Sequence, residues 1–223
     1  GAVARQMYEE TELELQGLPL DTLACRSMMK LKKGQAQTIA QSLQAEAQKA
    51  GFEPRRKKGK KYSPLLNPES SQDVLAFLQA QGHKISSTKE EDLKELSLAG
   101  CSFAGDLLQY RGLSHQVAFM EDWLLKLSPM DGRLHPGYFQ IQAATGRFSS
   151  REPNAQQIPK RGEDGLAMRR LFKAPPGKKL VKADLSGIEL RIMARLSQDK
   201  TMIEAFQAGQ DLHKLTASKI SGL

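Results

Sequence analysis

The segment Lys179–Arg191 constrains the fold of this chain more than any other part of its sequence. Its apolar residues Leu180 and Val181 predict a short buried strand that carries Asp184 to its carboxyl end. A strand end beside a helix N-terminus is where α/β proteins place chemistry, because backbone N–H groups and a fixed carboxylate meet there. Taken alone, Asp184 also fits a structural aspartate that ends a strand in a turn. Whether its role is structural or functional therefore depends on the neighbouring sequence.

A helix is expected to begin directly after this strand. Ser186 and Gly187 predict a tight turn, and Ser186 and Glu189 have the Ser-x-x-Glu spacing of a capping box. The apolar residues that follow recur every four positions along one helix face: Ile188, Ile192 and Leu196.

The bulk composition is that of a globular protein with an anionic partner. The 223 residues can form one or two domains with a core, and 39% of them are hydrophobic and 26% charged. The net charge of +8 favours nucleic acid, although an acidic protein or a membrane surface fits the same charge. The sequence has no apolar run of membrane-span length, no signal-peptide core at its N-terminus and no metal-type spacing of Cys25 and Cys101. We therefore expect a cytoplasmic protein with reduced cysteines.

The first 127 or so residues have the pattern of a helical module. One helix is expected over residues 6–16, and a second from a cap at Asp21 to about residue 50. A third is expected to begin at a cap at Ser70 or Ser71, and a fourth covers residues 104–127. A basic segment, residues 55–61, contains Arg55, Arg56, Lys57, Lys58, Lys60 and Lys61. We interpret this segment as a loop that binds duplex phosphates without reading sequence, with a solvated loop or a localisation signal as the alternative.

The composition changes at Pro129, where strand patterns begin. Alternating and aromatic residues predict strands over 132–135 and 138–142 and around Phe148. A polar loop over 149–159 and a helix over 166–172 follow. A last helix is expected over 212–220, capped by Asp211.

Four blocks in this second half form a specific combination. They are 144–150 (ATGRFSS), 152–159 (EPNAQQIP), 183–191 (ADLSGIELR) and 209–213 (GQDLH). Their identity and order resemble family A DNA polymerases of the bacterial DNA polymerase I type. Weaker similarity in the first half extends the resemblance over nearly the whole chain.

The resemblance implies an α+β fold, with a helical thumb followed by a partial antiparallel palm sheet with helices. The thumb would cover residues 1–127, with the first 22 or so packing on the palm. Residues 128–223 would form the N-terminal part of the palm and end before the fingers. The implied activity is template-directed DNA synthesis, in which deoxynucleoside triphosphates are added to the 3′-hydroxyl of a primer–template DNA.

The resemblance also assigns roles at the matching positions. Asp184 is similar to the first of two palm carboxylates that bind the catalytic metals, and the backbone carbonyl of Leu185 would be a further ligand. Two divalent ions stabilise the attacking and leaving oxygens of an in-line displacement, and hard oxygen ligands suit Mg²⁺. Glu189 resembles the steric gate that excludes a ribose 2′-hydroxyl, and His213 resembles the triphosphate-contacting histidine. Arg191 is expected to support the site without contacting a ligand.

Other matching positions imply contacts with DNA. Arg147 resembles the arginine that reaches the minor groove at the primer terminus, where one donor can test pairing geometry without reading sequence. Asn154, Gln156 and Arg161 match positions that touch template or primer. Their alternative role is to stabilise the polar loop.

The sequence departs from the usual bacterial pattern at several positions. Leu185 and Gly187 stand where Tyr and Gln are usual, and a Ser-Gly pair occurs in phage-type members. The protein is therefore expected either near the bacterial nucleoid or in the cytoplasm of a phage-infected host. Gln157 and Arg195 replace a common Asn and His without removing a known catalytic group.

The family's fingers helix and the motif with the second metal carboxylate do not occur in this sequence. One carboxylate cannot hold two metals, so the chain is expected to be inactive alone. Either a second polypeptide supplies these parts, or the chain is a fragment of a longer one. A non-catalytic duplex-DNA-binding module derived from a polymerase is the alternative function. An RNA-synthesising relative is disfavoured by Glu189.

Overall fold

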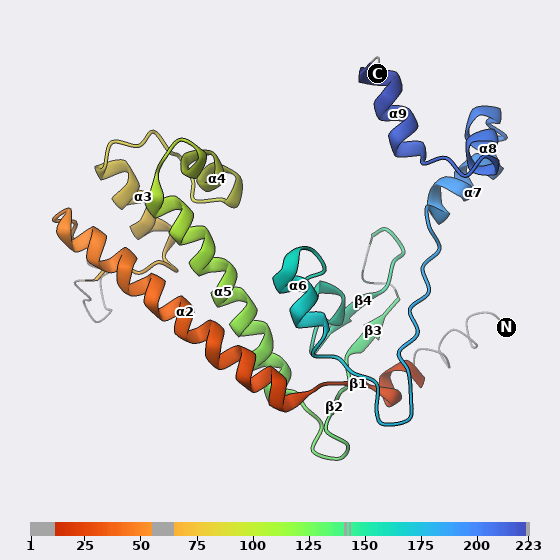
Figure 1. Ribbon diagram of the computed structural model, residues 1–223, viewed down its shortest axis with the longest axis horizontal. Coiled ribbons are helices and arrows are strands. Elements are labelled where there is room, and N and C mark those ends of the chain that lie inside the picture. Colours follow the sequence, from red (N-terminus) through yellow and green to blue (C-terminus); the bar gives the residue numbers. More distant parts are fainter. Residues whose placement is uncertain (1–11, 55–64, 141, 143, 222–223) are drawn as a thin grey trace. The chain divides into compact units, whose positions relative to one another are not determined.

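The computed structural model describes residues 12–54, 65–140, 142 and 144–221 (Figure 1). The basic segment 55–61 lies outside the described residues. The chain divides into two compact units, residues 1–178 and 179–223. The described residues are mostly helical and contain two small antiparallel sheets, which confirms the predicted α+β class.

The first unit is built on two long helices that run side by side, α2 (Thr22–Lys49) and α5 (Ser102–Leu125) (Figure 1). Two shorter helices, α3 (Ser71–Ala80) and α4 (Glu90–Leu98), lie between them in sequence. The predicted caps of two helices are confirmed, because Asp21 Oδ1 accepts from the Ala24 amide at 2.9 Å and Ser70 Oγ accepts from the Asp73 amide at 3.3 Å. Side-chain capping thus sets where α2 and α3 begin.

A first hydrophobic cluster fills the space among α2, α3, α4 and α5. Phe77 is its centre, with its ring centroid 4.5 Å from that of Phe103 and 5.3 Å from that of Phe52. The fully buried residues around these rings include Leu43, Leu78, Leu93 and Leu107. This cluster fixes the four helices as one body.

A second cluster surrounds Trp123, near the C-terminal end of α5. It joins α2 and α5 to helix α6 (Gly162–Arg169), and its buried members include Cys25, Met120 and Met168. Burial raises the pKa of the Cys25 thiol to about 11, so Cys25 is a core residue without thiolate character. Both cysteines are free, as expected.

The strands of the first unit are short and antiparallel. Strand β1 (Leu18–Pro19) pairs with β2 (Arg133–Leu134), and β3 (Gly137–Phe139) pairs with β4 (Ser149–Arg151). A one-turn 3-10 helix, η1 (Ala155–Gln157), follows β4 and leads toward α6. Strand character around residues 132–139 is therefore confirmed. The expected helix over 166–172 instead begins at Gly162 and ends at Arg169.

The second unit consists of three helices preceded by an irregular segment. The helices are α7 (Ile188–Ser197), α8 (Lys200–Gln207) and α9 (Leu212–Ser221). The strand predicted over residues 180–184 is wrong, because residues 179–185 have no regular structure and Val181 is 90% exposed. A strand needs a neighbour for its backbone N–H and C=O groups, and the described residues of this unit contain no other strand.

No described helix combines the length and the apolar character that crossing a membrane requires.

Candidate functional site

Asp184 lies in the exposed segment that leads into α7. The turn predicted at Ser186–Gly187 is present, and the Ile188 amide donates to the Leu185 carbonyl at 3.2 Å. The helix begins at Ile188, and its N-cap residue is Gly187 with a left-handed φ of +63°. The predicted capping box is therefore wrong: Ser186 lies one residue before the cap. Gly187 takes the cap position because glycine adopts a positive φ without the strain that a side chain causes.

Glu189 and His213 occupy the first turns of two different helices of the second unit. Glu189 is exposed in the first turn of α7. His213 follows the first residue of α9, whose start is capped by Asp211 as predicted, with the Lys214 amide 3.4 Å from Asp211 Oδ1. The His213 side chain lies outside the described part of the chain. Its backbone position is at a helix N-terminus, where amide dipoles favour phosphate.

The predicted DNA contacts belong to one loop region of the first unit. Arg147 is exposed and lies just before β4, and Gln156 Nε2 donates to the Phe148 carbonyl at 2.9 Å. Asn154 caps η1 by accepting from the Gln156 amide at 3.1 Å. Asn154 and Gln156 therefore have the loop-stabilising contacts of the alternative interpretation. The bond from Gln156 to the Phe148 carbonyl also places Gln156 close to Arg147, because Phe148 is the next residue along the chain.

Arg161 is the exposed N-cap residue of α6, and the segment before it is held by a residue that the sequence did not single out. The Arg169 guanidinium donates to the Pro159 carbonyl at 2.9 Å and to the Ile158 carbonyl at 3.0 Å. Ser150, which is buried, accepts from the Ala155 amide at 3.2 Å. These three bonds join residues that are 5, 10 and 11 positions apart, which match no helix or strand repeat in the sequence.

An ion pair connects α6 with the long helices. Lys32 Nζ lies 2.9 Å from Asp164 Oδ1, and Gln116 Nε2 lies 3.3 Å from Asp164 Oδ2. The Lys32 side chain is only 8% exposed, whereas Asp164 is 60% exposed. The Lys32 ammonium and then the Gln116 amide lower the pKa of Asp164, so the carboxylate is charged at neutral pH.

The described residues do not form a metal site by themselves. No group of three or more His, Cys, Asp or Glu side chains among them is arranged to hold an ion. Asp184 contributes one exposed carboxylate, whereas a tightly bound Mg²⁺ needs several oxygen ligands. Further ligands would have to come from elsewhere.

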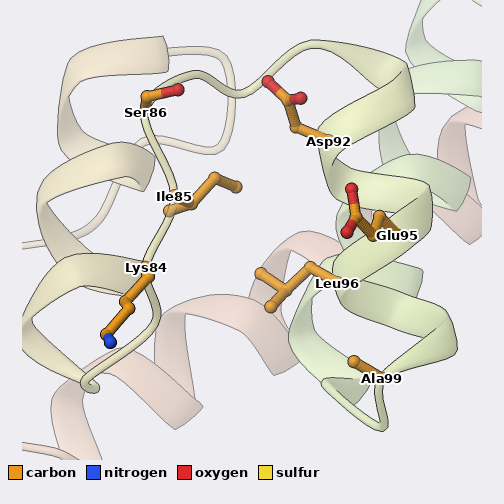
Figure 2. A pocket seen from close by; sticks show the side chains of 7 residues that line it. All are labelled: Lys84, Ile85, Ser86, Asp92, Glu95, Leu96 and Ala99. Atoms are coloured by element: carbon orange, nitrogen blue, oxygen red, sulfur yellow. The ribbon is translucent and has the colours of Figure 1, made fainter.

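A pocket of about 200 Å³ lies between the segment after α3 and helix α4 (Figure 2). Figure 2 shows Asp92, Glu95 and Leu96 of α4 on one side and Lys84, Ile85 and Ser86 on the other. None of the residues assigned a role above lines it. The pocket is therefore not part of the candidate site.

Comparison with known proteins identifies the class to which this fold and these motifs belong. The family described as DNA polymerase family A matches residues 23–223, so the chain belongs to this family. It is 38% identical over 218 residues to DNA polymerase I of Chloroflexus aurantiacus, covering 96% of this chain and 22% of that protein. It is 42% identical over 138 residues to DNA polymerase I of Pseudomonas aeruginosa, covering 61% of this chain and 15% of that protein.

A solved structure gives the same relationship. The chain is similar to the POL domain of Pol1 from M. smegmatis, solved in complex with DNA primer-template and dNTP, with a TM-score of 0.77 and 29% identity. The similarity covers 96% of this chain and 37% of that one. The chain spans about a fifth or less of the length of these two curated relatives. The resemblance to family A polymerases is confirmed, and the phage-like character inferred from Leu185 and Gly187 stays a prediction.

Proposed function

We propose that this chain supplies the thumb and the first palm segment of an enzyme that synthesises DNA on a template. The observation that carries this proposal is the family match, which extends over residues 23–223 and so includes most of the proposed thumb and the whole proposed palm segment. The proposed thumb is residues 1–127, and the proposed palm segment is residues 128–223. The solved relative in complex with primer-template and dNTP supports the same substrates for this chain.

Asp184 is proposed as one of two carboxylates that bind the catalytic ions, with Mg²⁺ as the metal. Bound Mg²⁺ would supply charge stabilisation at the transferred phosphate. The segment around Asp184 is irregular and exposed, and the Leu185 carbonyl accepts one hydrogen bond, from the Ile188 amide, which leaves a second lone pair of this oxygen for an ion. The second carboxylate must come from a further segment or from a second polypeptide.

Glu189 and His213 are proposed to contact the incoming nucleotide. Glu189 lies in the first turn of α7, five residues after Asp184, and would exclude a ribose 2′-hydroxyl. If it is this gate, Glu189→Ala in the completed enzyme should increase ribonucleotide incorporation relative to deoxynucleotide incorporation. An unchanged ratio would refute the gate and reopen RNA synthesis as an alternative. His213 would contact the triphosphate at the start of α9.

The proposed DNA contacts are Arg147, Asn154, Gln156 and Arg161 near the primer terminus and the basic segment 55–61 on the product duplex. Each phosphate that a basic residue neutralises contributes about 0.9 to the slope of log affinity against log salt. Replacing the six basic residues of segment 55–61 by Gln should therefore reduce this slope by up to about 5 in fluorescence-anisotropy titrations of the chain with duplex DNA. An unchanged slope would favour the solvated-loop alternative.

The proposal predicts that activity needs completion of the site. This chain with primed template, deoxynucleotides and Mg²⁺ should give no extension. Adding the missing fingers and palm residues, as a second polypeptide or in one longer chain, should give extension. Robust extension by the chain alone would contradict the proposal.

The alternative is a DNA-binding module that no longer takes part in catalysis. Duplex binding alone requires none of Asp184, Glu189 and His213, and all three are retained in the sequence. The completed assembly separates the two functions, because a pure binding module would retain duplex affinity and give no extension in any combination.

A further inference from the structure

Asp184 lies on a segment that has no helix or strand to hold it. The turn after it is closed by three hydrogen bonds among the described residues. The Ile188 amide donates to the Leu185 carbonyl at 3.2 Å, the Arg191 amide to the Gly187 carbonyl at 2.9 Å, and Arg191 Nε to the Ser186 carbonyl at 3.0 Å. The bond from the Arg191 amide is the first backbone hydrogen bond of α7 and would form with any side chain at this position, so the specific contribution of arginine is the bond to the Ser186 carbonyl.

The Arg191 side chain is itself held by an aromatic ring of the next helix. Its guanidinium carbon lies 4.5 Å from the ring centroid of Phe206 in α8, within the range of a cation–π interaction. The same ring lies near the turn, because a Cβ atom added to Gly187, which has none, would come to 4.0 Å from Phe206 Cε1. Phe206 thus contacts the turn through the side chain of Arg191.

We propose that Arg191 is a positioning residue for nucleotidyl transfer, which fixes the turn that carries Asp184 and the Leu185 carbonyl against Phe206. This inference rests on the proposed function. Arg191 is not proposed as a catalytic residue, because among the described residues its guanidinium contacts the Ser186 carbonyl and the Phe206 ring. It acts on the reaction through the backbone of residues 184–187.

The physical basis is the shape of the guanidinium group. Its plane can stack on an aromatic ring while an N–H at its edge donates to a carbonyl, so one side chain satisfies both contacts. A lysine at position 191 can donate to the carbonyl but does not stack in the same way, and a methionine has neither an N–H donor nor a planar cation, although it can pack on the ring. A misplacement of a reacting group by about 1 Å can reduce the rate about 100-fold.

The test compares variants of the completed polymerase in steady-state primer extension. Arg191→Met should reduce kcat by about 10-fold to 100-fold and raise the Mg²⁺ concentration needed for half-maximal activity. The Kd for duplex DNA should stay within about twofold, because the proposed DNA contacts belong to other segments of the chain. Arg191→Lys should recover part of kcat.

Phe206→Leu provides a second route to the same contact. It retains apolar volume and removes the ring face, so kcat should fall less than in Arg191→Met. The double variant should be no worse than Arg191→Met alone, because both substitutions remove one connected interaction. Arg195→Met, an exposed arginine on the same helix, is the matched control and should stay within about twofold of wild type in every parameter.

Two outcomes would overturn the inference. One is an Arg191→Met enzyme with wild-type kcat and Mg²⁺ requirement. The other is an equal fall in kcat and duplex affinity in Arg191→Lys, Phe206→Leu and Arg195→Met, which would indicate general destabilisation. Asp184→Ala in the same assay separates this failure from that of the proposed function: if it abolishes extension while Arg191→Met has no effect, only the positioning role is wrong.

Discussion

Replacement of Asp164 by Asn tests the connection between α6 and the long helices. Lys32 and Asp164 are 2.9 Å apart, but their environments differ, because the Lys32 side chain is 8% exposed and the Asp164 side chain 60%. A buried ammonium without a counter-charge is costly, whereas an exposed carboxylate without a partner returns to water. Substitution of Asp164 should therefore lower the free energy of unfolding more than substitution of Lys32.

The expected cost of Asp164→Asn is about 2 kcal/mol. Hydrogen bonds to charged groups contribute about 1.5–3 kcal/mol, and the exposure of Asp164 keeps the value below the 3–5 kcal/mol expected for a fully buried pair. Lys32→Met removes the desolvated charge itself and should cost about 1 kcal/mol or less. The neighbouring pair Lys33–Glu121 is the matched control: it has the same kind of contact at 3.0 Å but is 55% and 45% exposed. Glu121→Gln should cost about 0.5 kcal/mol.

Trp123 makes this measurement possible, because it is the only tryptophan of the chain and is fully buried in the cluster that α6 joins. Its fluorescence during thermal unfolding should show Tm lowered by about 4–8 °C in Asp164→Asn, at about 2–4 °C per kcal/mol. Equal losses in Asp164→Asn and Lys32→Met, or a loss in Glu121→Gln as large as in Asp164→Asn, would refute the reasoning.

The same contact predicts a pH dependence. Lys32 and Gln116 lower the pKa of Asp164 in the folded state. The ionised Asp164 therefore stabilises the folded state fully above its unfolded pKa of about 3.9, and this stabilisation is lost as pH falls through its folded pKa. The stability difference between wild type and Asp164→Asn should therefore be constant near neutral pH and shrink below about pH 4. A difference that grows on acidification would contradict this sign.

Two further predictions concern other parts of the first unit. Among the described residues, the hydrogen-bond partners of His135 are acceptors: Nδ1 lies 2.6 Å from the Glu14 carbonyl and Nε2 3.1 Å from both oxygens of Asp131. Both ring nitrogens can donate at once when the ring is protonated, and these contacts raise the pKa of His135. The wild type should therefore be more stable than His135→Gln below about pH 6.5, and this difference should disappear as pH rises through the folded pKa. Urea unfolding midpoints of both proteins from about pH 5.5 to 8.5 measure the difference. A difference that does not change with pH would count against the doubly protonated ring. Phe77→Ala should lower the free energy of unfolding by about 3–5 kcal/mol, because it opens a cavity beside two aromatic rings, whereas Leu98→Ala, at a position 90% exposed, should change it by at most about 0.5 kcal/mol. Equal effects in urea titrations would mean that the first cluster is not the core.

Helix starts were predictable because capping depends on residues that are close in sequence. Asp21, Ser70 and Asp211 each accept from an amide three residues later, as their types and positions indicated. At the start of α7 the same rule failed. Ser186 and Glu189 have the right spacing, but Gly187 adopts a left-handed conformation and takes the cap position. The spacing of two polar residues does not reveal the backbone conformation of the glycine between them.

The strand predicted before Asp184 failed for a different reason. Leu180 and Val181 have strand-forming character, but a strand forms only where a second backbone satisfies its hydrogen-bonding groups. Local sequence reports the apolar pattern and says nothing of the partner. The long-range contacts were unpredictable for the same reason. Lys32 to Asp164 depends on how α2 and α6 meet, and Arg169 to the Pro159 carbonyl depends on how the loop before α6 folds back along that helix.

The residues of the candidate site were identified from motif resemblance, and the structure adds the local backbone conformation and hydrogen bonds around them. It gives the turn after Asp184, the helix start before His213 and the hydrogen bond from Gln156 to the Phe148 carbonyl. Their roles in catalysis and DNA binding stay predictions.

The most direct test of the proposed function is Asp184→Ala in the completed polymerase, with extension rate and duplex affinity measured on the same preparation. A metal-binding carboxylate predicts loss of extension, at least about 1,000-fold, with the Kd for duplex DNA unchanged within about twofold. Glu204→Ala, an exposed acidic position in the same unit, should leave both quantities unchanged. Extension that persists in Asp184→Ala would contradict the assignment of this carboxylate to the polymerase site.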